Sequence, residues 1–106
     1  MGLISFAAFR PKPGREQELL TVIDERVALM RSLGLVTERP VVNMRAGDGT
    51  IIQVSEWASQ EAIDRAHETP EVLALWRRYE ECADHVMPGS LPDLADPFPC
   101  FETLGP

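Results

Sequence analysis

The stretch "IIQVSEWASQEAIDRAHETPEV", residues 51–72, passes from a β-prone run into two successive helix starts. Its first residues are mostly β-branched, which favours a strand that ends near Trp57. Ser59 is a typical N-cap for a short helix. Thr69 and Pro70 form a second start, with a capping hydroxyl followed by proline at the first helical position. The stretch therefore predicts a strand, a short helix and a longer helix in that order.

A glycine turn, Gly47-Asp48-Gly49, precedes this stretch. It joins two β-prone segments, Val36–Ala46 and Thr50–Trp57, and its glycines permit the positive φ angles that hairpins require. Pro40 has no backbone N–H to give to a ladder, so the first arm is predicted to be an edge strand or to be bulged there. The two segments therefore predict a β-hairpin.

The N-terminal part predicts a strand and a helix. Residues Gly2–Arg10 are mostly apolar and end at a turn cluster, Pro11–Gly14. The segment Arg15–Leu33 follows, with Gly34 just past its last turn as a C-cap. Its apolar residues recur at spacings of three and four, which predicts an amphipathic helix with a buried stripe of Leu20, Ile23, Val27 and Met30.

The C-terminal part continues the helix that starts at Thr69. Apolar residues recur there at helical spacing through Val72, Leu75, Trp76, Tyr79, Cys82, Ala83 and Val86. Pro88–Pro97 is rich in turn residues, and Phe98–Leu104 is predicted to form the last strand of the sheet.

The resulting order, β-α-β-β-α-β, is that of a ferredoxin-like α+β fold with an antiparallel sheet and helices on one face, in a single domain covering residues 1–106. The strands carry apolar residues at both parities, as in Ile4 and Phe9 or in Ile51 and Ile52. The face without helices should therefore also be buried. A second copy of the chain is the simplest cover, so we expect a homodimer.

Composition excludes several classes of function. The formal net charge of −7 opposes binding to nucleic acid, and no apolar run is long enough to span a membrane. The N-terminus lacks the features of a secretory signal, which predicts a cytoplasmic location. Cys82 and Cys100 lie in segments predicted as helix and strand, so we expect reduced thiols rather than a disulfide framework.

The segment quoted above resembles the hairpin-to-helix part of the antibiotic biosynthesis monooxygenase family, and the element order extends the likeness over nearly the whole chain. The resemblance implies a homodimer in which two ferredoxin-like sheets face each other as a dimeric α+β barrel. The family includes cofactor-independent oxygenases of polyketide quinols, heme-degrading oxygenases and proteins without established activity. The fold alone does not choose among these.

The quinol-oxygenating branch of that family has an Asn-x-x-x-Trp run on the third strand, a tyrosine on the following helix and an arginine on the next. Here Trp57 matches the tryptophan and Gln53 stands at the asparagine position. Ile63 falls where the tyrosine would be and cannot transfer a proton. Trp76 or Arg77 meets the arginine position. Part of the set is therefore present.

The heme-degrading branch needs an asparagine on the first strand, a tryptophan on the short helix and a histidine ligand on the next helix. The comparable places here hold Ser5 or Phe6, then Ala66, then Trp76 or Arg77. A heme-degrading activity therefore fits poorly.

The resemblance and the residue types together give a set of candidate site residues. Gln53, Trp57 and His67 are the candidate catalytic residues, and Asn43, Ser55, Trp76 and Tyr79 are the candidate substrate-binding residues. Asn43 and Gln53 are expected opposite each other across the hairpin, but a shift of one residue would place them on opposite faces of the sheet.

In the enzyme hypothesis these residues act on a small aromatic or polyketide-like phenol or quinol. Gln53 would orient oxygen atoms, Trp57 would stack on the substrate, and His67 would accept the phenolic proton. The simpler interpretations are that Trp57 is a packing residue and that His67 caps a helix end. A non-catalytic binding or dimerisation module of the same fold is the alternative function. In either case the sequence predicts no heme, flavin or metal cofactor.

Two further patterns are weaker. Cys82 and His85 are three apart on the predicted helix, as a nucleophile and its base would be, but no orienting acid is evident. The chain's two histidines and two cysteines form no compact set of zinc ligands.

Overall fold

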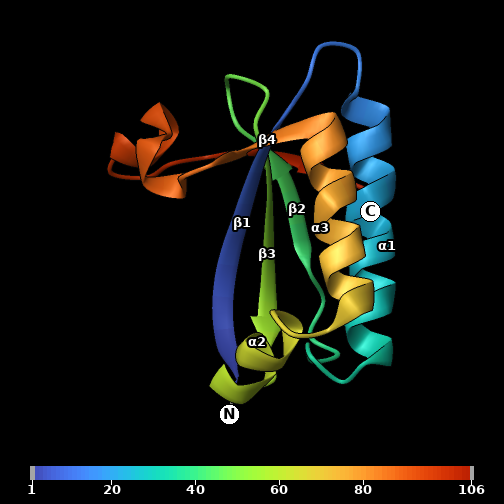
Figure 1. The fold of residues 1–106 in the computed structure, drawn as a ribbon. Coiled ribbons are helices and arrows are strands. Elements are labelled where there is room, and N and C mark those ends of the chain that lie inside the picture. Colours follow the sequence, from blue (N-terminus) through green and yellow to red (C-terminus); the bar gives the residue numbers. More distant parts are fainter. Residues whose placement is uncertain (1, 106) are drawn as a thin grey trace.

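The computed structural model describes residues 2–105, which form a five-stranded antiparallel sheet and three α-helices (Figure 1). The strand order is β4-β1-β3-β2-β5. The elements are β1 (Leu3–Pro11), α1 (Glu16–Ser32), β2 (Val42–Arg45), β3 (Ile51–Trp57), α2 (Gln60–Ala66), α3 (Pro70–Cys82), β4 (Ala83–Val86), the 3₁₀ turns η1 (Pro88–Ser90) and η2 (Pro92–Ala95), and β5 (Glu102–Leu104). The first four strands have the ferredoxin-like arrangement, so the predicted α+β fold class is confirmed.

Helices α1 and α3 lie side by side on one face of the sheet (Figure 1). The core between them and the sheet is apolar, and its buried members include Leu19, Val22, Ile23, Ile51, Leu75 and Cys82. A second cluster, around Met30, Leu35 and Trp57, fills the end where α2 closes the layer. The predicted buried stripe of α1 differs in part from the observed one. Leu19 and Val22 are buried, whereas Leu20 and Val27, which were predicted to be buried, are only half-buried.

The last strand of the ferredoxin-like unit is not where the sequence placed it. Helix α3 ends at Cys82, and the chain passes directly into β4, which pairs with β1 from Ala8↔Val86 to Pro11↔Ala83. Ala83 and Val86 lie on opposite faces of β4, Ala83 in the core beneath the helices and Val86 in the cluster on the other face. Because both faces are buried there, two apolar residues three apart on a strand have the same spacing as on a helix. The C-terminal strand β5 is an addition that pairs with β2 at the other edge of the sheet.

The predicted hairpin and the two predicted helices are present in the structure, with small differences at their ends. Strand β2 is shorter than its predicted arm, and the exposed Pro40 lies before it, just after a bend, so Pro40 neither bulges the strand nor belongs to it. The Ser59 hydroxyl accepts a hydrogen bond of 3.0 Å from the Ala62 N–H and caps α2 as predicted. The Thr69 hydroxyl instead donates to the Arg65 carbonyl at 2.7 Å, so only Pro70 marks the start of α3 as expected.

The sheet face without helices is partly covered by the segment that contains η1 and η2, which extends away from the helices before the chain returns to β5 (Figure 1). Leu91 is buried there against Ala8, Ile52 and Val86. The other end of this face stays open and apolar, with large side chains exposed at Ile4 (55%), Phe6 (48%) and Val42 (49%). We call these three residues, with the half-buried Val54 between them, the open apolar face. Within residues 2–105, no helix has both the length and the apolar character that crossing a lipid bilayer requires.

Candidate functional site

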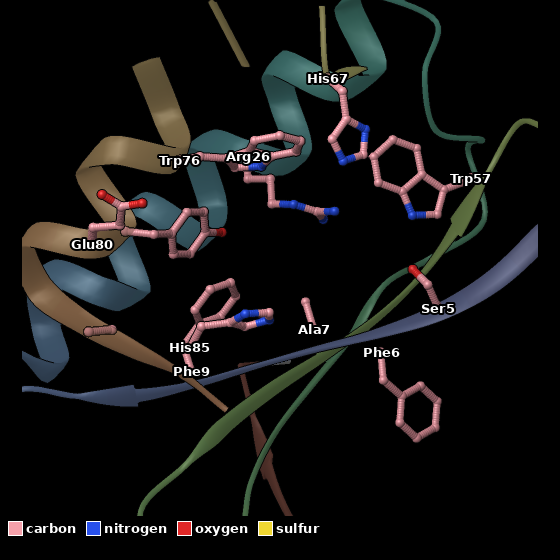
Figure 2. Close-up of a pocket in the computed structure, with 12 residues that line it drawn as sticks. Ser5, Phe6, Ala7, Phe9, Arg26, Trp57, His67, Trp76, Glu80 and His85 are labelled. Atoms are coloured by element: carbon pink, nitrogen blue, oxygen red, sulfur yellow. The ribbon is translucent and has the colours of Figure 1, made fainter. Parts of the chain in front are cut away.

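A cavity of about 440 Å³ lies between the sheet and helices α1 and α3 (Figure 2). Its lining gathers both tryptophans of the chain, its single tyrosine and both histidines. These residues are Trp57, Trp76, Tyr79, His67 and His85, and the rest of the lining is Ser5, Phe6, Ala7, Phe9, Arg26, Glu80 and Ala83. Such a concentration of aromatic and imidazole rings around one hollow is typical of a site for a small organic ligand.

Small side chains on the strands leave the space for this cavity. On β1, Ser5 and Ala7 point toward the helices, whereas Phe6 points to the opposite side of the sheet (Figure 2). Ser5 pairs with Ser55 on β3, which is also small. Alternation along β1 thus puts the short side chains of Ser5 and Ala7 on the floor of the cavity.

Arg26 of α1 is the only charged side chain that is buried within residues 2–105, with 6% of its surface exposed. It stands four residues after Val22 and four before Met30, in the middle of the buried stripe of the helix. Its guanidinium lies 5.7 Å from the centroid of the Trp57 ring, a distance at which a cation is attracted to an aromatic face. Figure 2 shows it reaching across the cavity toward Trp57.

Arg26 is held by a short chain of amides. Its Nη1 donates a hydrogen bond of 2.7 Å to Oε1 of Gln53, and Nε2 of Gln53 donates one of 3.0 Å to Oδ1 of Asn43. A guanidinium can only donate, so Gln53 must turn its carbonyl toward Arg26 and its NH₂ toward Asn43. Asn43 and Gln53 are directly paired across the hairpin, which confirms the expected register.

No ion pair joins Arg26 to a carboxylate in the described part of the chain, although seven other ion pairs occur there. Burial lowers the pKa of the Arg26 guanidinium from its ordinary value, because a charge is poorly solvated there. Glu80 also lines the cavity, but it is exposed, and Figure 2 places it at the end away from Trp57. The inner part of the site is therefore positively charged and not neutralised by the protein.

Tyr79 forms one wall of the cavity. Its ring stacks on Phe9, with 4.3 Å between centroids and 15° between planes. Its hydroxyl is buried, and no hydrogen-bond partner for it exists among residues 2–105. Burial raises the pKa of this hydroxyl, and the positive charge of Arg26 opposes that effect. Tyr79 therefore brings a phenol group with an unused donor and an unused acceptor to the wall of the cavity that Arg26 also lines.

His67 is at the C-terminal end of α2 and serves there as a cap. Its Nδ1 lies 2.8 Å from the Ile63 carbonyl oxygen, which can only accept, so Nδ1 carries the hydrogen. In the neutral ring Nε2 is then unprotonated and able to accept a proton. The ring meets Trp76 edge to face at 5.1 Å between centroids and points toward the cavity beside Trp57 (Figure 2).

The structure brings together four of the seven residues proposed from the sequence. Trp57, His67, Trp76 and Tyr79 all line the cavity. The other three, Gln53, Asn43 and Ser55, do not line it. Gln53 lies behind Arg26 with both of its polar groups engaged, and Ser55 is buried in the sheet.

Sequence reasoning missed Arg26 and the placement of His85. The signal for Arg26 was present, because Leu19, Val22, Arg26 and Met30 follow helical spacing and put an arginine on an apolar stripe. His85 lies on β4 rather than on the helix with Cys82, and its ring is 5.4 Å from that of Phe9.

Cys82 does not form the nucleophile and base pair that its spacing from His85 suggested. Its side chain is fully buried at the end of α3, and burial raises the pKa of the thiol. Within the part of the chain that the structure describes, no three His, Cys, Asp or Glu residues are placed to hold a metal ion. The titratable side chains that line the cavity are those of Arg26, Tyr79, Glu80 and the two histidines.

Residues 3–78 match the family model described as antibiotic biosynthesis monooxygenase. The chain belongs to this family. The match covers the elements from β1 through most of α3, including Arg26, Gln53 and Trp57, whereas Tyr79 and His85 lie beyond it. Strand β4 and the C-terminal segment therefore lie outside the residues that the family model matches.

Among solved structures, Rv0793 from Mycobacterium tuberculosis resembles this family member with a TM-score of 0.62 and 18% sequence identity. The likeness covers 83% of this chain and 95% of that one, and at this identity it shows a common fold. A search of proteins with curated descriptions found no match to the sequence.

Proposed function

We propose that the protein is a cofactor-independent monooxygenase that acts on a small aromatic or polyketide-like phenol or quinol bound in the cavity. The observation that carries the proposal is the gathering of every tryptophan, tyrosine and histidine of the chain around one hollow, in a member of the antibiotic biosynthesis monooxygenase family. Aromatic walls bind a planar substrate, and an imidazole beside them supplies a base.

An anthrone illustrates the chemistry. The base removes a proton, and the resulting anion transfers electrons to O₂ and forms a carbon–oxygen bond at the ring CH₂. Loss of water then converts that CH₂ to a carbonyl, so one oxygen atom enters the product and the other leaves as water. The substrate supplies all the electrons, which is why no flavin, heme or metal is required.

The site residues divide the work according to their positions. Trp57 and the stacked pair of Phe9 and Tyr79 would hold the ring system. Nε2 of His67 would accept the phenolic proton, since Nδ1 is engaged with the helix end. Gln53 would act through Arg26 rather than on oxygen directly, because its carbonyl and its NH₂ are both engaged.

We also propose that the protein works as a homodimer formed through the open apolar face. Ile4, Phe6 and Val42 are about half exposed on one side of the sheet, and the C-terminal segment covers only the neighbouring end. An antiparallel sheet with one helical layer is stabilised when its second face is covered. A second copy places the same apolar surface opposite, as a two-fold interface requires.

The test is oxygen consumption by the purified protein against a panel of hydroquinones and anthrones, with and without a chelator. Turnover that survives chelation and falls in Trp57→Phe and Gln53→Ala would support the proposal. The exposed Phe98→Ala variant is the matched control, because Phe98 is 89% exposed and lies outside the cavity. Heme copurifying at one per chain would contradict it. Saturable binding without oxygen consumption across the panel would instead favour the non-catalytic binding module.

A further inference from the structure

The interior of the cavity holds a positive charge that the protein leaves without a counter-ion. Arg26 is nine-tenths buried, and its one hydrogen bond within residues 2–105 goes to the neutral amide of Gln53. A guanidinium offers several N–H donors in a planar fork that matches an oxyanion. Most of that donor capacity is therefore unused in the protein alone.

A purely structural role explains this arrangement poorly. A buried cation is costly unless it is paired, and an apolar residue at this position of α1 would pack between Val22 and Met30 without that cost. The lowered pKa of Arg26 reflects the same lack of compensation. The Trp57 ring offsets part of the cost, but an aromatic face does not replace a carboxylate.

A second polar group of the cavity lining is buried without a partner. The Tyr79 hydroxyl has no hydrogen-bond partner in the described chain, and Tyr79 lines the same cavity as Arg26. The partly used guanidinium of Arg26 and the unpartnered hydroxyl of Tyr79, on the neighbouring helices α1 and α3, thus border one cavity. A buried polar group left unpaired is destabilising, so their joint presence points to a ligand that satisfies both.

We propose that the cavity takes an aromatic compound bearing one negatively charged oxygen group, a carboxylate or an ionised phenol, held by the guanidinium of Arg26 and the hydroxyl of Tyr79. The proposal rests on the proposed function insofar as it concerns the same cavity, but it requires binding and not turnover. Gln53 and Asn43 are positioning residues in this arrangement, because they orient the guanidinium without reaching the ligand.

The ligand's charge can be tested with matched probes. Naphthoate and naphthamide differ in charge but hardly in shape. Para-nitrophenol at mildly alkaline pH, where it is largely ionised, and para-nitroanisole form the corresponding phenolate pair. Both tryptophans of the protein line the cavity, so intrinsic tryptophan fluorescence reports on its occupancy, and calorimetry provides an independent measure of the dissociation constant.

In the parent protein, at least one anion should bind more tightly than its neutral analogue by roughly tenfold to a hundredfold, as expected for charge-assisted hydrogen bonds. A preference within the naphthoate and naphthamide pair would indicate a carboxylate ligand, and a preference within the nitrophenol and nitroanisole pair would indicate a phenolate. Arg26→Met should reduce the preference to about twofold or less while binding of the neutral analogue persists. Arg26→Lys should retain part of it. Tyr79→Phe should weaken anion binding by roughly threefold to tenfold.

Arg65→Met is the matched control, since Arg65 is an exposed arginine on α2 outside the cavity and its loss changes net charge equally. It should leave the preference intact. Equal binding of charged and neutral probes by the parent, an undiminished preference in Arg26→Met, or no saturable binding of either anion would overturn the proposal. Anion binding without oxygen consumption would support the proposed anion site and contradict only the proposed oxygenase activity.

Discussion

The ring of Tyr79 lies flat against that of Phe9, with 4.3 Å between centroids, and this contact ties α3 to β1 across the cavity wall. Tyr79 is the only tyrosine of the chain, so the near-ultraviolet absorbance of tyrosinate reports on this one hydroxyl. Burial raises its pKa above the ordinary value of 10.0. We therefore expect no tyrosinate signal in the folded protein at that pH, and a signal only at higher pH.

The raised pKa of Tyr79 also makes the free energy of unfolding depend on pH in the alkaline range. Above the pKa of the unfolded tyrosine, the folded state binds more protons than the unfolded state, so the free energy of unfolding falls as pH rises. Stability should be retained below about pH 10 and lost progressively above it. Urea unfolding of Tyr79→Phe, which lacks the titrating group, should show a weaker decline over that range. A normal tyrosinate titration in the folded protein would contradict the burial of the hydroxyl.

The start of α2 depends on one hydroxyl. Ser59 Oγ accepts a hydrogen bond from the Ala62 N–H, and Ser59→Ala removes this acceptor. We expect a loss of about 1 kcal/mol in the free energy of unfolding, the usual cost of removing an N-cap. Ser59→Thr is the comparison, because threonine keeps the hydroxyl oxygen that accepts at the N-cap. An equal loss in Ser59→Thr would show that the capping hydrogen bond is not the cause.

The elements up to α3 could be predicted because each has a local marker in the sequence. Gly47-Asp48-Gly49 marks the hairpin, and Ser59 and Pro70 mark the two helix starts. No comparable marker separates α3 from β4, since the chain changes from helix to strand between Cys82 and Ala83 without a glycine or proline. The boundary between α3 and β4 is set by the pairing of β4 with β1. Local periodicity in the sequence does not reveal which strand a segment will pair with.

The sequence predicted the aromatic residues of the candidate site but not its buried positive charge. Trp57, Trp76 and Tyr79 line the cavity as expected. Arg26 is missed because arginines in helices are mostly surface residues and apolar periodicity predicts a stripe through Val27 instead. Gln53 was assigned to the cavity, but its position behind Arg26 depends on a side chain 27 residues earlier in the sequence. Such a contact requires the fold to be known.

The open apolar face gives a direct test of the proposed dimer. Phe6→Glu places a charge among Ile4, Val42 and the half-buried Val54, and it should convert the dimer to a monomer. Leu3→Glu is the control, because Leu3 is exposed to a similar degree (43% against 48%) but lies at the opposite parity of β1. Light scattering at micromolar concentration measures the outcome. A monomeric parent, or dissociation in both variants alike, would argue against this interface.

The bond between Arg26 and Gln53 predicts strong coupling between the two residues. Gln53→Leu leaves the buried guanidinium without its partner and should cost about 2–4 kcal/mol of unfolding free energy. Arg26→Met removes the charge itself and should be close to neutral or stabilising. In the double variant the cost of Gln53→Leu should largely disappear, because no unpaired cation remains. Denaturant unfolding of the four proteins gives the coupling energy, and additive effects would contradict the contact.

His67 bonds to the helix end through Nδ1 and also lines the cavity, where Nε2 is the proposed proton acceptor, and two substitutions can separate these roles. His67→Ala removes both, so it should cost about 0.5–1.5 kcal/mol of stability and lower turnover of a responsive phenol by roughly 10²–10⁴-fold. His67→Gln keeps an N–H that can donate to the Ile63 carbonyl but provides no base. It should therefore restore much of the stability without restoring turnover, while substrate binding changes little. If His67→Gln instead oxidised the phenol at the parental rate, the histidine would serve only as a cap, and the proton acceptor would have to be sought in His85, the other imidazole of the cavity.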